Sequence, residues 1–329
     1  MKAVLITKPG NEDVLQLGEF SEPVPGAADL LINVKYAGIN RADLMQRQGF
    51  YPPPPGASPV LGLECSGVVA AAGPQVKGWR VGERAMALLP GGGYAEQAVV
   101  DYGSAMHVPA SLSDEEAAAL PEVYLTAFLN LFMLAQVKSG QSVLIHGGGS
   151  GVGTASIQLL KIAGAKTIVT AGSDAKCEQC LKFGADLAIN YNSGPFTPKV
   201  KAATNDRGAD VILDSIGGAY LMPNIEALAP GGRLVLIGLM KGAKSEVDLA
   251  LVLRRHLTIY GSTLRSRSAA EKAEIVAAFL ARFGRELEAG AIRPQIYRCV
   301  PLADAAQAHR MMQASEHFGK IVLKVAGLD

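Results

Sequence analysis

A glycine-rich turn constrains the fold of this chain more than any other segment. Residues 147–153 read Gly-Gly-Gly-Ser-Gly-Val-Gly and separate an apolar run, residues 141–146, from a helix-like run, residues 154–161. A turn of this kind between a buried strand and a helix lets a pyrophosphate approach backbone N–H groups and the helix N-terminus. The spacing is not Gly-x-Gly-x-x-Gly, because Thr154 stands at the sixth place counted from Gly149. The strand–turn–helix context therefore carries the prediction of a nucleotide site, against the alternative of a glycine-rich surface loop.

Strand and helix patterns alternate after this turn. The runs at residues 166–170, 187–190, 210–214 and 233–237 predict strands, and residues 175–183 predict a helix. Strands that are apolar throughout, with helices between them, indicate a parallel sheet covered by helices on both faces. We therefore expect a doubly wound α/β domain.

The tip of the second strand indicates which nucleotide binds. Sites selective for NADH place a carboxylate there, about 20 residues after the glycines. This strand ends in Ala171, Gly172 and Ser173, and Asp174 follows only after the turn. Ser173 can donate to a 2′-phosphate and Lys176 can pair with it, and each such bond is worth roughly 1.5 to 3 kcal/mol. We expect NADPH to be preferred, with a solvated helix lysine as the alternative role of Lys176.

Composition excludes several other classes of protein. The chain of 329 residues carries 31 basic and 30 acidic side chains, so no surface for nucleic acid or an anionic membrane is expected. No run of about 18 uncharged apolar residues predicts a membrane span. Cys177 and Cys180 form a lone C-x-x-C at helical spacing, without the further ligands that a zinc site needs. We expect a soluble protein of the cytoplasm with free thiols.

The first part of the chain has a different pattern. Short alternating runs broken by Gly and Pro predict a compact, mostly β domain in the form of a partly open barrel. These runs are residues 30–36, 60–63 with 67–72, 84–89 and 94–100. The tail predicts helix, strand, helix and strand at residues 269–289, 296–300, 302–314 and 320–325. We expect this tail to return to the first domain, so that residues 1–124 with 265–329 form one domain and residues 125–264 form the nucleotide domain.

Five segments in collinear order resemble a known family. They are Ala-Gly-Ile-Asn-Arg-Ala-Asp-Leu-Met-Gln-Arg-Gln-Gly-Phe-Tyr at 37–51, Pro-Val-Leu-Gly-Leu-Glu at 59–64, Leu-Pro-Glu-Val-Tyr-Leu-Thr-Ala at 120–127, Asp-Ser-Ile-Gly-Gly at 214–218 and Gly-Lys-Ile-Val-Leu at 319–323. The glycine turn lies in order between the third and the fourth. Together they are similar to the zinc-free quinone oxidoreductases related to zeta-crystallin, a branch of the medium-chain dehydrogenase/reductase superfamily. The resemblance implies a GroES-like catalytic domain, a Rossmann domain, NADPH as cofactor and a quinone as substrate.

The resemblance also implies that no metal is bound. Asn40 and Leu63 stand where zinc-using relatives have a cysteine and a histidine, and neither offers the thiolate or imidazole that zinc prefers. The cysteine-rich structural zinc lobe is also missing between Gly82 and Leu112. A quinone accepts hydride at an electron-poor ring and forms a resonance-stabilised anion, so positioning suffices and water can deliver the proton.

Individual roles follow from the resemblance. It places Asn40, Tyr51 and Thr126 near the nicotinamide and the substrate. Tyr51 packing on residues 52–55, and Asn40 capping a helix over residues 41–48, are the alternatives. The cofactor residues are Ser150, Gly151, Val152 and Gly153 at the pyrophosphate, Ser173, Lys176 and Tyr191 at the adenosine phosphate, Gly238, Leu239, Met240, Leu264, Arg265 and Ser266 at the nicotinamide end, and Lys320 reaching in from the catalytic domain.

Three functions stay open at this point. The first is an NADPH-dependent quinone reductase, and the second is reduction of an enone or enoyl thioester, because both acceptors carry a conjugated carbonyl. The third is a non-catalytic NADPH-binding sensor or structural protein. The resemblance also implies a homo-oligomer, most simply a dimer, in which an edge strand at residues 257–263 pairs across a two-fold axis.

Overall fold

The structure, a computed structural model, describes residues 1–325 and divides the chain into two compact units. We name them after their expected roles: the nucleotide unit is Thr126–Thr263, and the catalytic unit is Met1–Leu125 with Leu264–Asp329. Each boundary lies one residue from its expected position. Within the described residues, no helix combines the length and apolar character needed to cross a bilayer.

The nucleotide unit contains a six-stranded sheet in which every pairing is parallel. Its strands are β8 (Ser142–His146), β9 (Lys166–Ala171), β10 (Leu187–Asn190), β11 (Ala209–Asp214), β12 (Leu228–Leu236) and β13 (Thr258–Gly261). They lie in the order β10-β9-β8-β11-β12-β13, so the direction of winding reverses between β8 and β11. This confirms the doubly wound sheet, and ligands bind such sheets at that reversal.

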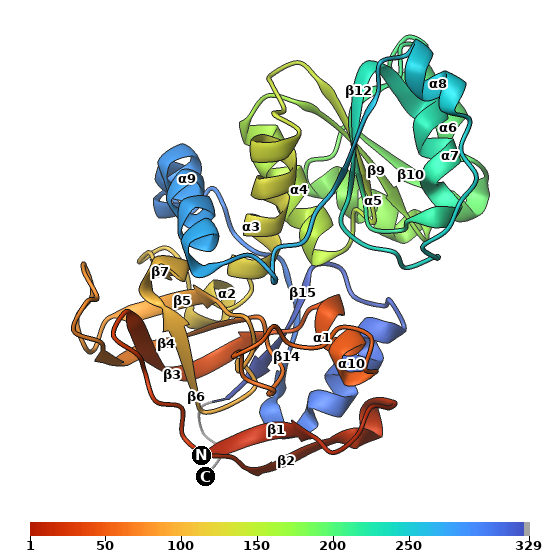
Figure 1. Ribbon diagram of the computed structural model, residues 1–329. Helices are drawn as coiled ribbons and strands as arrows, with labels where there is room; N and C mark the ends of the chain where they lie inside the picture. Colours follow the sequence, from red (N-terminus) through yellow and green to blue (C-terminus); the bar gives the residue numbers. More distant parts are fainter. Residues whose placement is uncertain (326–329) are drawn as a thin grey trace. The chain divides into compact units, whose positions relative to one another are not determined.

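Helices cover both faces of this sheet because each crossover must return to the start of a parallel strand. They are α4 (Gly151–Ile162), α5 (Asp174–Phe183), α6 (Phe196–Ala203), α7 (Gly218–Ala227) and α8 (Leu249–Arg254). Helices α4 and α5 contact each other on one face, and α6 and α7 pack together on the other (Figure 1). A buried cluster that includes Leu144, Ile168, Ile189, Ile212 and Leu234 draws one side chain from each of five strands.

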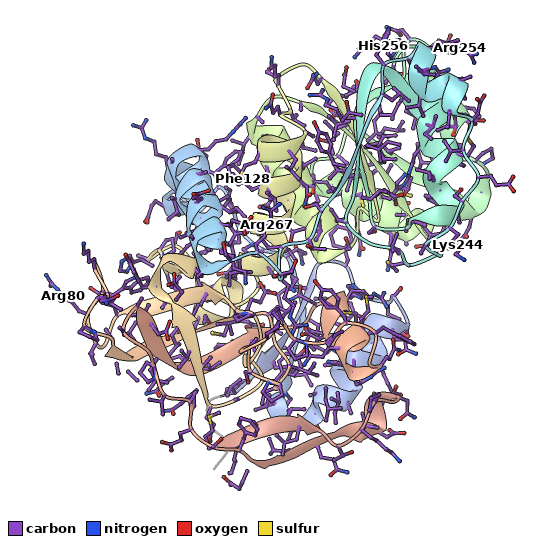
Figure 2. All side chains as sticks on the ribbon, viewed as in Figure 1. Arg80, Phe128, Lys244, Arg254, His256 and Arg267 are labelled. Carbon is purple, nitrogen blue, oxygen red and sulfur yellow. The ribbon has the colours of Figure 1, made fainter. Side chains whose placement is uncertain are left out.

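A helix whose end widens to π geometry precedes the sheet. It runs through α3 (Pro121–Phe128) and continues as a π-helix, Leu129–Leu134. Phe128, labelled in Figure 2, stacks on Phe132 with ring centroids 5.9 Å apart. This apolar contact ties the two helical segments together.

The catalytic unit is built on a mixed sheet whose central strand is β3 (Asp29–Gly38). Its other strands are β4 (Glu64–Ala72), β5 (Arg84–Leu88), β6 (Gln97–Asp101), β7 (Ala105–His107), β14 (Ile296–Pro301) and β15 (Lys320–Lys324), and β1 (Lys2–Ile6) pairs with β2 (Leu15–Glu19) apart from it. One edge of β3 pairs with β4, while β6 and β15 share its other edge at successive positions. The expected return of the tail to this sheet is therefore present in β14 and β15.

Four helices complete the catalytic unit: α1 (Arg41–Arg47), α2 (Asp114–Ala117), α9 (Ala269–Glu288) and α10 (Ala305–Gln313). The expectation of a strand at residues 60–63 is wrong, because the strand begins only at Glu64. Gly62 has φ +105°, and the carbonyls of Leu61 and Gly62 accept from Tyr94 and Gly93. These residues are apolar because they are buried, so their pattern mimics a strand.

Candidate active site

The glycine turn forms the start of α4. Ser150 is the N-cap residue, and its Oγ accepts from the Gly153 N–H at 3.0 Å. Its own N–H donates to the Gly147 carbonyl, and a Cβ on Gly153 would overlap that same oxygen. The first turn of a helix leaves N–H groups without intrahelical partners, so the N–H groups of Gly151 and Val152 point outward for an anion. The turn fits a pyrophosphate.

A polar chain under this turn joins the carboxyl ends of three strands. His146, at the end of β8, pairs its Nδ1 with Thr170 Oγ1 at 3.1 Å and its Nε2 with Asn224 Oδ1 at 2.7 Å. Asn224 donates in turn to Asp214 at 3.0 Å, and Gly147 donates to Thr170 Oγ1. Because Asn224 Oδ1 can only accept, the Nε2 atom of His146 carries the proton. Burial lowers the pKa of His146 to about 4, so the ring stays neutral.

The predicted adenosine-phosphate residues gather at the tip of β9. Ser173 caps α5 and accepts from the Lys176 N–H at 3.2 Å. A Cβ added to Gly172 would lie only 2.6 Å from the Tyr191 hydroxyl oxygen, so the tyrosine packs closely against this glycine. Lys241, which the resemblance groups with residues 238–240 at the nicotinamide end, lies 5.7 Å from the Tyr191 ring centroid and 5.7 Å from that of Tyr220. The nucleotide unit thus brings Ser173, Lys176 and Tyr191 to one strand end and adds a second lysine.

The residues expected at the nicotinamide end lie in two places. Gly238, Leu239 and Met240 follow β12, with Leu239 and Met240 half exposed and the Met240 N–H bonded to the Ser215 carbonyl at 3.2 Å. Leu264, Arg265 and Ser266 begin the second segment of the catalytic unit, where Leu264 and Arg265 are buried and Ser266 is exposed. Thr126 opens the nucleotide unit and receives a bond from Asn130 Nδ2 at its carbonyl oxygen. Their contacts with a cofactor stay predictions.

In the catalytic unit, Asn40 and Lys320 meet at a buried carboxylate. Lys320 Nζ lies 2.6 Å from Glu64 Oε1, 2.6 Å from Asn40 Oδ1 and 2.6 Å from the Ile39 carbonyl oxygen. Asn40 Nδ2 donates to the same Glu64 oxygen at 2.9 Å. Asn40 is the N-cap residue of α1, as its alternative role predicted, yet its side chain is turned to Glu64 and Lys320.

A second polar cluster forms around Asp43 of α1. Asp43 accepts from the N–H groups of Asn40 and Gly62 and from the Tyr94 hydroxyl at 3.1 Å. Burial raises the pKa of Asp43 to about 6 against these bonds. The Tyr94 hydroxyl also contacts His309 Nε2 at 3.3 Å. Burial and the neighbouring Arg47 lower the pKa of His309 to about 3.

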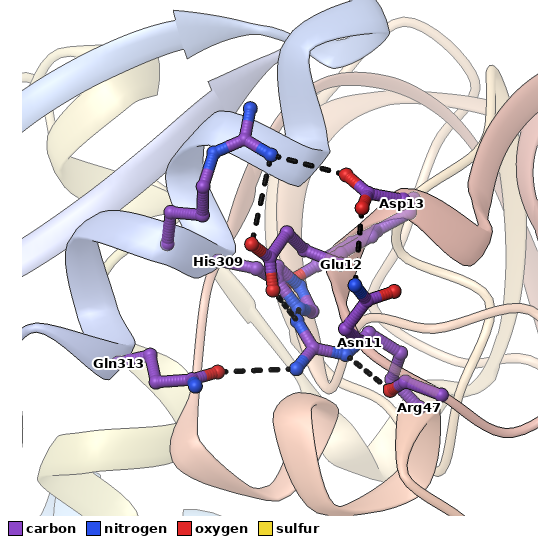
Figure 3. A network of polar contacts seen from close by, with 9 residues as sticks. Asn11, Glu12, Asp13, Arg47, His309 and Gln313 are labelled. Atoms are coloured by element: carbon purple, nitrogen blue, oxygen red, sulfur yellow. Dashed lines mark hydrogen bonds and ion pairs between the residues drawn. The ribbon is translucent and has the colours of Figure 1, made fainter.

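Arg47 connects this cluster to the surface of the catalytic unit (Figure 3). Its guanidinium, fully buried, contacts His309 Nδ1 at 3.2 Å, Gln313 Oε1 at 3.2 Å and the Gly10 carbonyl at 3.2 Å. Glu12 lies 4.0 Å away as its counter-ion. Each guanidinium nitrogen makes a hydrogen bond, and two of the partners lie on α10, so we infer that Arg47 is a structural tie between α1 and α10.

Tyr51 is held by Arg265. The guanidinium donates to the carbonyls of Tyr51 at 3.2 Å and Pro90 at 2.8 Å and to Gln46 Oε1 at 2.6 Å, and it lies 5.3 Å from the Tyr51 ring centroid. The structure therefore shows a cation–π contact between Arg265 and the Tyr51 ring, in addition to the expected alternative that Tyr51 packs on its proline neighbours. Burial raises the pKa of Tyr51, and the charge of Glu122 adds to the shift.

Glu122 is a residue that the sequence motifs contained without indicating a role. Its N–H donates to Glu64 Oε2 at 2.8 Å, while its own Oε2 is buried and has no hydrogen-bond partner among residues 1–325. Burial, with the charge of Glu64 next to it, raises the pKa of Glu122 to about 8. The carboxyl is therefore mostly protonated at neutral pH. A glutamate inside an apolar run, as in residues 59–64 and 120–127, is the signal that would have singled out Glu64 and Glu122.

These side chains do not fit zinc. Asn40 offers an amide, Leu63 is apolar and buried, and the ammonium of Lys320 already contacts the Asn40 and Glu64 oxygens. Among the described residues, no group of three or more His, Cys, Asp or Glu side chains gathers as metal ligands would. These oxygen acceptors thus suit the Lys320 ammonium better than a zinc ion, which prefers thiolate and imidazole ligands.

Two protein-family models match the chain. One is described as an alcohol dehydrogenase GroES-like domain and matches residues 26–110, and the other is described as a zinc-binding dehydrogenase and matches residues 151–282. Among curated proteins, a mycocerosic acid synthase-like polyketide synthase of Mycobacterium tuberculosis is 33% identical over 321 residues, which are 97% of this chain and 15% of that protein. The chain thus spans only a small part of such relatives.

Solved structures match over the whole chain. An NAD-dependent alcohol dehydrogenase superposes with a TM-score of 0.86 at 32% identity, covering 99% of this chain and 100% of that one. The quinone oxidoreductase of Escherichia coli, solved in complex with NADPH, superposes with a TM-score of 0.87 at 28% identity, covering 99% and 100% of the two chains. These matches extend through both units.

Proposed function

Because this chain belongs to the medium-chain dehydrogenase/reductase superfamily of oxidoreductases, we propose that it is an NADPH-dependent, zinc-independent quinone reductase. The observation that carries the proposal is the Lys320–Glu64–Asn40 arrangement, in which Asn40, at one of the two positions matched to zinc ligands, is bound to Glu64 and Lys320, while Leu63 stands at the other. Oxidising an alcohol benefits from a metal that stabilises the alkoxide, whereas a quinone needs only an oriented hydride and a polar group at its oxygen.

The residues of the chain divide this work between them. We propose that the Gly151 and Val152 N–H groups hold the pyrophosphate and that Asn40 and Tyr51 meet the acceptor. When bound, NADPH supplies the hydride. Addition to the acceptor places an electron pair on its carbonyl oxygen, and a hydrogen-bond donor aimed at that oxygen stabilises the charge. The Glu122 carboxyl, which is mostly protonated at neutral pH, is a candidate proton donor in the same unit as Tyr51 besides water.

The preference for NADPH over NADH is proposed from the tip of β9. Ser173 offers a hydroxyl there, and Asp174, the nearest carboxylate, is engaged by Asn190 Nδ2 at 2.8 Å. The relative solved with NADPH and the relative named as NAD-dependent show that the fold itself accommodates either nucleotide. Titrations of NADPH and NADH into the wild type and into Ser173→Ala and Lys176→Ala test the proposal. Unchanged discrimination in Lys176→Ala contradicts a phosphate role for that lysine.

Reduction of an enone or enoyl thioester is the second candidate. It is favoured by the polyketide synthase relatives, in which a segment similar to this chain is a small part of a larger protein. Steady-state NADPH oxidation with a panel of quinones, alkenals and enoyl thioesters separates the two. If the rate with enoyl thioesters is far above the rate with every quinone, thioester reduction becomes the preferred function. Tight NADPH binding without turnover of any acceptor indicates a sensor or structural protein instead.

Two further features are proposed for the whole molecule. We propose a homodimer that pairs through β13, which is an edge strand with Ile259 partly exposed. We also propose that the enzyme works in the cytoplasm, because Cys65, Cys177, Cys180 and Cys299 are all free thiols. Turnover should survive dialysis against a chelator, and its loss would contradict zinc independence.

A further inference from the structure

The ion pair of Lys320 and Glu64 is unusually deep. Lys320 is 2% exposed, Glu64 is fully buried and Asn40 is 7% exposed. Taking two charges out of water costs several kcal/mol per ion unless close contacts compensate. Burial of the pair therefore does not by itself account for it as a source of stability.

Lys320 has no donor left for a ligand. An ammonium carries three N–H groups, and the Ile39 carbonyl, Asn40 Oδ1 and Glu64 Oε1 provide three acceptors at 2.6 Å each. Direct contact with a cofactor, as the sequence suggested, would require one of these bonds to break. The arrangement therefore serves the residues that Lys320 holds.

The two charges fix which way the Asn40 amide faces. An ammonium can only donate, so the atom facing it must be the amide oxygen, and a carboxylate can only accept, so the atom facing Glu64 must be the amide nitrogen. A flipped amide would place N–H groups against the ammonium and oxygen against the carboxylate. The Asn40 Nδ2 donates one of its two hydrogens to Glu64, which is its only acceptor among residues 1–325. The second N–H is thus available, in a fixed orientation.

The backbone supports this geometry from three elements. Asn40 precedes α1, Glu64 begins β4 and Lys320 begins β15, and both strands pair with β3. A Cβ on Gly38 would overlap Glu64 Oε1 and the Ala118 carbonyl, so the carboxylate occupies space that only glycine leaves. Glu64 Oε2 accepts from the Glu122 N–H at 2.8 Å, which fixes the other end of the carboxylate.

We propose that Lys320 and Glu64 are positioning residues that hold Asn40 so that its second amide N–H donates to the carbonyl oxygen of the acceptor. The inference rests on the proposed reductase function and deepens it. Hydride adds to the conjugated carbon, the π electron pair moves onto the carbonyl oxygen, and a proton from water completes the reduction. The nicotinamide C–H bond breaks and NADPH is oxidised. The ammonium against Oδ1 also polarises the amide, which strengthens its N–H as a donor.

The test compares three changes by steady-state NADPH oxidation with a quinone. Asn40→Ala should lower kcat on the order of 100-fold, the usual loss for one donor at a developing oxyanion. The neutral pair Glu64→Gln with Lys320→Gln should lower kcat roughly tenfold, because the amide keeps its donor and loses its orientation. The double change avoids leaving Glu64 buried without a partner if Lys320→Gln alone fails to fold. Lys35→Gln, which breaks the partly buried Lys35–Asp114 pair, is the matched control.

Coupling distinguishes positioning from a general structural role. In an Asn40→Ala background, the neutral pair should have no further effect on kcat, and the Kd of NADPH should stay within twofold of the wild type throughout. Additive losses, or a loss confined to KM or to NADPH binding, overturn the inference. Wild-type turnover that the neutral pair leaves unchanged also overturns it. Absence of turnover of any conjugated carbonyl by the wild type instead refutes the proposed function.

Discussion

Replacing Glu122 by glutamine should stabilise the protein relative to the wild type, and this advantage should grow as the pH rises. In the folded state the pKa of Glu122 is raised to about 8 by burial, compared with 4.5 for an exposed glutamate. The contribution of the neutral Glu122 carboxyl to the free energy of unfolding is fully present below pH 4.5. It is lost as the pH rises through 8, because the carboxyl ionises at lower pH in the unfolded chain than in the folded one. A difference of 3.5 pKa units at about 1.36 kcal/mol each gives about 5 kcal/mol as an upper limit.

Glutamine removes this penalty because it does not ionise and is similar in size to glutamate. The free energy of unfolding of Glu122→Gln, minus that of the wild type, should therefore grow between pH 4.5 and 8 and level off above. Urea unfolding at a series of pH values measures it. Glu274→Gln, on the exposed side of α9, controls for removing a carboxylate. A difference that is constant from pH 5 to 8.5, as in the control, refutes the reasoning.

Three other predictions follow from single contacts. Gly38→Ala should destabilise the catalytic unit by about 2 kcal/mol or more, because its Cβ would overlap the Ala118 carbonyl and the fixed Glu64 carboxylate. Gly261→Ala, which has open space around its Cβ, should leave stability unchanged, and thermal unfolding of the two variants measures the difference. As the pH falls from 6.5 to 4, buried His146 should stay neutral while the same histidine in the unfolded chain takes up a proton, so the free energy of unfolding should fall by up to about 3 kcal/mol. An NMR titration in which the His146 ring protonates with a pKa above 6 contradicts this. If β13 pairs two copies, Ile259→Lys should yield monomers in sedimentation, and an unchanged oligomer contradicts that pairing.

The sequence predicted the nucleotide unit well because its signals are local. The buried parallel strands are rich in apolar residues on both faces, so β8, β9, β10 and β11 were located to within a residue or two, and the glycine turn stands between strand and helix. The catalytic unit was harder, because its strands are short and a buried loop such as residues 60–63 has the same composition as a strand.

The site in the catalytic unit could be predicted only in part. Asn40 and Lys320 were named, but the carboxylate that joins them was not, since Glu64 approaches each of them only through the pairing of β3 with β4 and β15. The same holds for Asp43, Tyr94 and His309, which come from three distant segments. Spacing along a chain carries no signal for contacts of this kind.

The sharing of one edge of β3 between β6 and β15 has a consequence for biosynthesis. Lys320 and Asn40 are separated by 280 positions, so the ribosome releases the first half of the catalytic unit long before the strand that completes it. The nucleotide unit is one continuous stretch and is entirely translated by then. Nascent chains therefore acquire their dinucleotide fold early, and the amide that we assign to the acceptor is set in place only after Lys320 has emerged.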